Sequence, residues 1–164
     1  MIPKTRKGLK KIYKRCENKF IKIDPKLYIE YQNLAYEDFD SAKKEENPRW
    51  AATKAYQALF LMCNSILVKK AGIYSKNHNC VLIALFWKNI ISENILENVQ
   101  NSFLEKNKIW VSPLNNLLYN RISEIRIARN RLLYLPNSLR KITISTEKII
   151  EDVRQLIQLL GEIE

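Results

Sequence analysis

The spacing of apolar residues most constrains this fold, because they recur every three or four positions between a few strong helix breakers. Asp24-Pro25 and Ser112-Pro113 each pair an N-cap residue with a proline at the first helical position. Gly72 is the expected C-cap of the second helix. No alternating pattern is long enough for a sheet. The sequence predicts an all-α, up-and-down bundle of four to five helices, at about 25–46, 49–71, 80–91, 113–135 and 145–163.

Composition narrows the class of protein. The chain has 164 residues, which suits one domain, and 46% are apolar, which is enough for a core. Three glycines cannot supply a glycine-rich phosphate loop. The longest apolar run, residues 81–87, is too short to span a membrane.

The cysteines favour a protein without structural metal. Cys16, Cys63 and Cys80 are odd in number and far apart, and with a single His they do not form a zinc-finger pattern. We expect reduced thiols in a reducing compartment, hence a cytoplasmic location, and no cofactor or metal.

The net charge of +11 is concentrated at the N-terminus, because residues 1–26 contain ten Lys or Arg and only two acids. The sequence predicts that residues 1–26 form a basic amphipathic arm and that residues 27–164 form the bundle. The arm could dock on the bundle through an apolar stripe. It could also bind RNA or DNA phosphates, or adsorb to an anionic membrane or act as a transit peptide. The apolar stripe comprises Leu9, Ile12, Tyr13, Cys16, Phe20 and Ile23, and the candidate phosphate contacts are Lys7, Lys11, Lys14 and Arg15.

The predicted helix over 113–135 holds a second basic cluster. Arg126, Arg129 and Asn130 lie three or four positions apart and therefore share a face, with Arg131 beside them. Guanidinium groups match phosphate oxygens in a bidentate fork, which makes Arg126 and Arg131 candidate nucleic-acid contacts. The alternative is a set of structural ion pairs, such as Arg121 with Glu124.

The run AYQALF at residues 55–60 resembles the A-Y-Y-A-x-F helix of the HEPN superfamily. As in that family, a Gly turn and a Ser-and-His loop follow, here Gly72, Ser75 and His78. The family's late Arg–polar–His motif matches Arg129 and Asn130, with Tyr134 in place of the His. The resemblance covers about residues 27–163.

The resemblance implies a small helical bundle that dimerises. Many such proteins are metal-independent endoribonucleases of toxin–antitoxin or defence systems, and others bind RNA or nucleotides without cutting or pair with a minimal nucleotidyltransferase. In a nuclease, Arg129 would stabilise charge on the phosphate, Asn130 would position it, and Tyr134 would stand where the family's His moves the proton.

Tyr134 weakens the nuclease interpretation, because an ordinary Tyr has a pKa near ~10 and is a poor base at neutral pH. Arg129 and Tyr134 are also about 140° apart around a helix and converge only if the helix ends between them. His78, the sole His, is expected to cap the next helix or to bind backbone. We therefore expect an RNA- or nucleotide-binding protein, active or weakened. The alternatives are an interaction module for a nucleotidyltransferase and a structural helical homodimer.

Overall fold

The fold is all-α. The computed structural model describes residues 6–88, 115–134 and 145–162. Within that part of the chain lie six α-helices: α1 (Arg6–Cys16), α2 (Tyr28–Lys44), α3 (Pro48–Ala71), α4 (His78–Trp87), α6 (Asn115–Tyr134) and α7 (Thr146–Gly161). The end of the predicted 80–91 helix and the expected Ser112-Pro113 cap lie outside the described residues. None of the described helices is long and apolar enough to cross a membrane.

Helix starts follow the local capping chemistry of the sequence. Asp24 accepts a hydrogen bond from the Lys26 amide, and Pro25 opens the short 3₁₀ turn η2 (Pro25–Leu27) that leads into α2. The side chain of Asn47 caps α3, and that of Ser145 caps α7. Gly72 ends α3 with a φ of 61°, a left-handed conformation that suits glycine.

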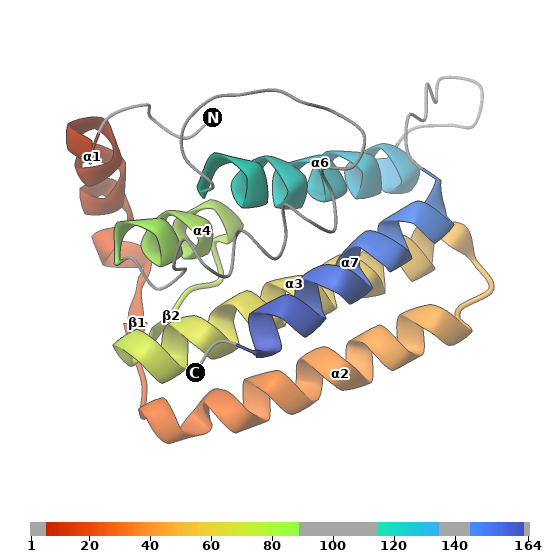
Figure 1. The fold of residues 1–164 in the computed structure, drawn as a ribbon, viewed down its shortest axis with the longest axis horizontal. Coiled ribbons are helices and arrows are strands. Elements are labelled where there is room, and N and C mark those ends of the chain that lie inside the picture. The colour runs from red at the N-terminus through yellow and green to blue at the C-terminus, as the bar shows by residue number, and fades with distance from the viewer. Residues whose placement is uncertain (1–5, 89–114, 135–144, 163–164) are drawn as a thin grey trace.

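Helix α3 is the centre of the bundle. It contacts α2, α6 and α7, with α2 on one side and α6 on the other, and α2 and α6 run opposite to α3 and α7 (Figure 1). Apolar side chains cover nearly its whole circumference because neighbours surround it. The largest fully buried side chains of the core come from four helices, α3, α4, α6 and α7: Leu59, Met62, Leu67, Val68, Val81, Leu85, Ile125, Ile149, Leu156 and Leu160.

The N-terminal helix docks on α4 through its apolar side. Leu9 and Tyr13 pack against the core, and the Tyr13 ring stacks on those of Phe20 and Trp87 with centroids 5.5 and 5.7 Å away. The first of the three possibilities for the arm, docking on the bundle through an apolar stripe, is therefore observed. The described Lys and Arg side chains of α1 remain exposed. The prediction of one apolar stripe as far as residue 23 is wrong, because α1 ends at Cys16.

A small sheet, which the sequence did not predict, follows α1. The chain passes through a 3₁₀ turn, η1 (Glu17–Lys19), into β1 (Ile21–Lys22), which pairs antiparallel with β2 (Ile73–Tyr74). The Ile23 amide also donates to the Gly72 carbonyl at 3.0 Å. Two-residue strands are too short for any alternating pattern to reveal.

The expectation of three reduced cysteines is wrong. Cys16 and Cys80 form a disulfide although 64 positions separate them, because α1 packs beside α4 and brings their Cα atoms to 5.5 Å. Only Cys63 is free; it is buried in α3, and burial raises the pKa of its thiol to about 12. With Cys16 and Cys80 paired, the cysteines no longer indicate a reducing compartment.

Candidate phosphate-binding site

Three helices bring polar and aromatic side chains together beside the first turn of α4. We call this group the Arg–His cluster: Tyr56 and Phe60 from α3, His78 and Asn79 from α4, and Arg126 and Arg129 from α6. Two of the site residues predicted from the sequence, Arg126 and Arg129, belong to this cluster.

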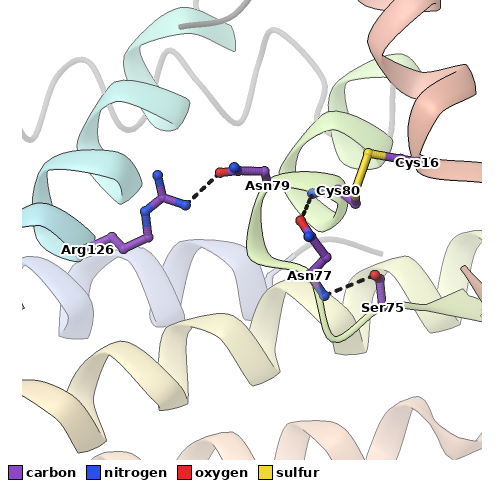
Figure 2. Close-up of a disulfide and its surroundings, with 6 residues drawn as sticks. All are labelled: Cys16, Ser75, Asn77, Asn79, Cys80 and Arg126. Atoms are coloured by element: carbon purple, nitrogen blue, oxygen red, sulfur yellow. Dashed lines mark hydrogen bonds between the residues drawn. A yellow bond between two sulfur atoms is a disulfide. The ribbon is translucent and has the colours of Figure 1, made fainter. Parts of the chain in front are cut away.

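The cluster depends on where α4 begins. The sequence predicted a polar turn at 76–79 and a helix from Cys80, but Asn77 is the N-cap, its side chain accepting from the Cys80 amide at 3.1 Å. The Ser75 hydroxyl accepts from the Asn77 amide (Figure 2). The Asn64 side chain hydrogen-bonds to both backbone groups of Ser75. This anchored loop places His78 at the first position of the helix.

His78 binds a side chain rather than capping a helix or bonding backbone, so that prediction is wrong. Its Nδ1 lies 2.9 Å from the Tyr56 hydroxyl, and its ring centroid lies 3.9 Å from that of Phe60. Burial raises the pKa of Tyr56 to about 12, so the phenol keeps its proton. In the tautomer in which Tyr56 donates to Nδ1, Nε2 carries the ring proton and can donate to a ligand.

Arg129 also lies against the Tyr56 ring, with its guanidinium carbon 4.8 Å from the centroid. The side chain is half-buried, and its buried Nε has no hydrogen-bond partner in the described part of the chain. No carboxylate pairs with Arg129 among the described residues. A buried N–H donor on a cationic group raises the free energy of the folded state unless it meets a hydrogen-bond acceptor. A bound anion would supply such an acceptor for the Nε of Arg129.

Arg126 also has a neutral partner. Its Nη1 donates to the Asn79 side-chain oxygen at 2.6 Å, across the gap between α6 and α4 (Figure 2). By contrast, Arg121 forms ion pairs with the fully buried Asp152 and with Glu124. The structural ion-pair interpretation is therefore correct for Arg121, whereas neither arginine of the cluster has a carboxylate partner in residues 6–88, 115–134 and 145–162.

The local field favours an anion. Burial, then Arg129 and then Arg126 lower the pKa of His78 to about 4, so the imidazole is neutral at neutral pH. Two guanidinium charges then face one neutral ring. A phosphate placed here would neutralise them and could accept hydrogen bonds from the arginines, and from Nε2 of His78 in that tautomer.

The rest of the predicted catalytic set is not brought together within this chain. Helix α6 continues through Tyr134, as the predicted helix over 113–135 requires, so it does not end between Arg129 and Tyr134 and their angular separation stays. Asn130 and Arg131 are exposed, and Tyr134 is 70% exposed. The Arg49 guanidinium donates hydrogen bonds to the carbonyls of Leu132 and Leu133 in the last turn of α6, which have no partner within the helix.

A basic surface lies across α4 from Arg126. The side chains predicted to contact phosphates from the arm are all exposed on α1, and Lys10 is exposed beside them; α1 contains no acid. The exposed bases are Lys7, Lys10, Lys11, Lys14 and Arg15. None of them has an ion pair within the described residues. We call this surface the α1 basic face.

No cluster of His, Cys, Asp and Glu in residues 6–88, 115–134 and 145–162 could hold a metal ion. Comparison of the chain with models of protein families, with curated proteins and with solved structures gave no match.

Proposed function

We propose that this protein binds RNA, with a backbone phosphate held by the Arg–His cluster and neighbouring phosphates by the α1 basic face. The observation that carries this proposal is Arg129, a half-buried guanidinium stacked on Tyr56 with an unsatisfied Nε and no described carboxylate partner. The HEPN resemblance of the α3 and α6 sequences agrees with an RNA ligand, and the protein is then an HEPN-like member.

A polymer fits better than a free nucleotide. The α1 basic face runs from Lys7 to Arg15, which is nine residues or about 13 Å of helix and therefore spans more than one backbone phosphate. Clustered Lys and Arg side chains release counterions when they neutralise a nucleic-acid backbone, so affinity would depend steeply on salt.

We favour binding over cleavage as the primary activity. Asn130 and Tyr134 are exposed whereas Arg129 is half-buried, so a cleavage centre of the family type would require a second copy of the chain to complete it. Such a weakened, metal-independent endoribonuclease is the secondary proposal. If it exists, Tyr134→His raises its rate, Arg129→Gln abolishes it, and a chelator leaves it unchanged.

The test compares two variants that each remove one positive charge. Anisotropy of a labelled 20-nucleotide single-stranded RNA is measured at 50 mM salt with wild type, Arg129→Gln and Lys44→Gln. Lys44 is an exposed base at the end of α2. Because a hydrogen bond to a charged group is worth about 1.5–3 kcal/mol, we expect Arg129→Gln to weaken binding at least tenfold. We expect Lys44→Gln to weaken it less than threefold.

Equal losses for Arg129→Gln and Lys44→Gln would place the RNA away from the Arg–His cluster. No binding by wild type at 50 mM salt would refute the proposed function as a whole. Deletion of residues 1–16 should reduce the slope of log affinity against log salt, because several phosphate contacts disappear.

A further inference from the structure

The disulfide joins the α1 basic face to the helix that carries part of the Arg–His cluster. Cys80 follows Asn79 directly in α4, and Asn79 is the residue that Arg126 contacts. Figure 2 shows Cys16 reaching Cys80 from one side of this turn while Arg126 reaches Asn79 from the other. One helical turn therefore bears both the covalent link to α1 and a contact of the candidate site.

The charge and length of α1 make its position dependent on tertiary contacts. It contains six bases and no acid in 11 residues, so its side chains repel one another. A helix of that length is marginal by itself in water, and its helicity depends on docking. Its noncovalent contacts include the partly buried apolar side chains of Leu9 and Tyr13, with the Lys88 ammonium 6.0 Å from the Tyr13 ring centroid.

We propose that the Cys16–Cys80 disulfide is a redox-controlled latch that fixes the α1 basic face beside the Arg–His cluster and thereby sets the affinity for RNA. The proposal rests on the proposed function. When the bond is present, both surfaces are held in one arrangement before RNA arrives, and little ordering is needed on binding. When the bond is reduced, α1 can leave α4, and its bases no longer act together with Arg126 and Arg129.

The oxidant is a disulfide of the glutathione class. A thiolate of one cysteine attacks a sulfur of oxidised glutathione, forms a mixed disulfide and releases one glutathione thiolate. The second cysteine thiolate then attacks the protein sulfur of the mixed disulfide and releases the second glutathione. Two protein thiols are oxidised, one glutathione disulfide is reduced, and the two protons end on the released glutathiones. Excess reduced glutathione reverses both steps.

The experiment uses the full chain equilibrated in glutathione buffers that contain either mainly oxidised or mainly reduced glutathione. Alkylation and intact mass count the thiols, and we expect one free thiol, Cys63, after oxidation and three after reduction. Anisotropy with the same 20-nucleotide RNA should then show at least fivefold tighter binding by the oxidised protein. Cys16→Ser and Cys80→Ser should bind like reduced wild type in both buffers, and Cys63→Ala should keep the redox response.

Equal RNA affinity of oxidised and reduced wild type would overturn the latch, as would a redox response that persists in both Cys16→Ser and Cys80→Ser. Reduced wild type carries no substitution, so the comparison stands even if a variant fails to fold. If neither redox form binds RNA, the proposed function fails and the latch is judged by trypsin. Cleavage within α1 should then be at least fivefold slower in the oxidised form, and equal rates would refute the latch.

Discussion

The pKa of His78 reports the charge arrangement of the Arg–His cluster, and Arg129→Gln perturbs it most directly. Burial and the two arginines lower this pKa to about 4. Replacing Arg129 by glutamine keeps a side chain of similar shape over Tyr56 and removes one positive charge. The pKa of His78 should rise, because protonation no longer meets that repulsion.

The distances set a lower limit on the effect. His78 and Arg129 both lie against the Tyr56 ring, with centroid distances of 5.2 and 4.8 Å. They are therefore at most about 10 Å apart, and at an effective dielectric constant of about 20 the repulsion is worth about 1.7 kcal/mol or more. That energy corresponds to a pKa higher by about one, so the variant should titrate near about 5.

The chain contains a single His, so its Cε1 proton gives one isolated NMR signal. In wild type, this signal should hardly move between about pH 8 and 5, since the pKa lies below that range. Arg131→Gln is the matched control, because it removes an exposed charge from the same helix and Arg131 is not among the groups that lower the pKa of His78. A wild-type pKa near ~6.5, or equal effects of the two variants, would refute this geometry.

Three further predictions concern stability. Asp152→Asn should lower the free energy of unfolding by about 3 kcal/mol in urea, because Asp152 is fully buried in ion pairs, whereas Asp40→Asn at an exposed pair should leave it nearly unchanged. Equal costs would contradict this. Reducing the Cys16–Cys80 bond, which closes a loop of 64 residues, should cost about 4 kcal/mol on the chain-entropy model, and an unchanged unfolding midpoint would oppose it. Finally, unfolded His78 takes a proton below about pH 6.5 but folded His78 only near pH 4, so acidification should destabilise the protein. The full effect is about 3 kcal/mol, which solvent screening of a half-buried ring reduces to about 1–2. His78→Gln should remove that component, and an identical pH profile for the variant would refute it.

Features decided by neighbouring residues were predictable from sequence. The N-cap at Asp24 and the C-cap at Gly72 follow from local backbone and side-chain chemistry, and each is present. The sequence placed the start of α4 too late because Asn77 and Asn79 are both possible N-caps. In the structure, the Asn77 amide donates to the Ser75 hydroxyl and the Asn77 side chain caps the helix.

The site depended on contacts that no local pattern encodes. Arg126 and Arg129 were recognisable as a cationic face of one helix, but their neighbours come from α3 and α4. The pairing of Tyr56 with His78 joins residues 22 positions apart through the crossing of two helices. The sequence drew attention to His78 because it is the only His and lies in a motif-like loop, but its partner Tyr56 could be identified only from the tertiary structure. The Cys16–Cys80 disulfide was unpredictable for the same reason.

The most direct test of the central claim is the His78 signal in the presence of RNA. Titration of the 20-nucleotide RNA into wild-type protein should shift this signal with the same midpoint as the anisotropy. The bound phosphate should raise the pKa of His78 from about 4 toward its ordinary value, because its negative charge offsets Arg126 and Arg129. RNA that saturates the anisotropy while the signal and pKa of His78 stay unchanged would contradict a phosphate in the Arg–His cluster.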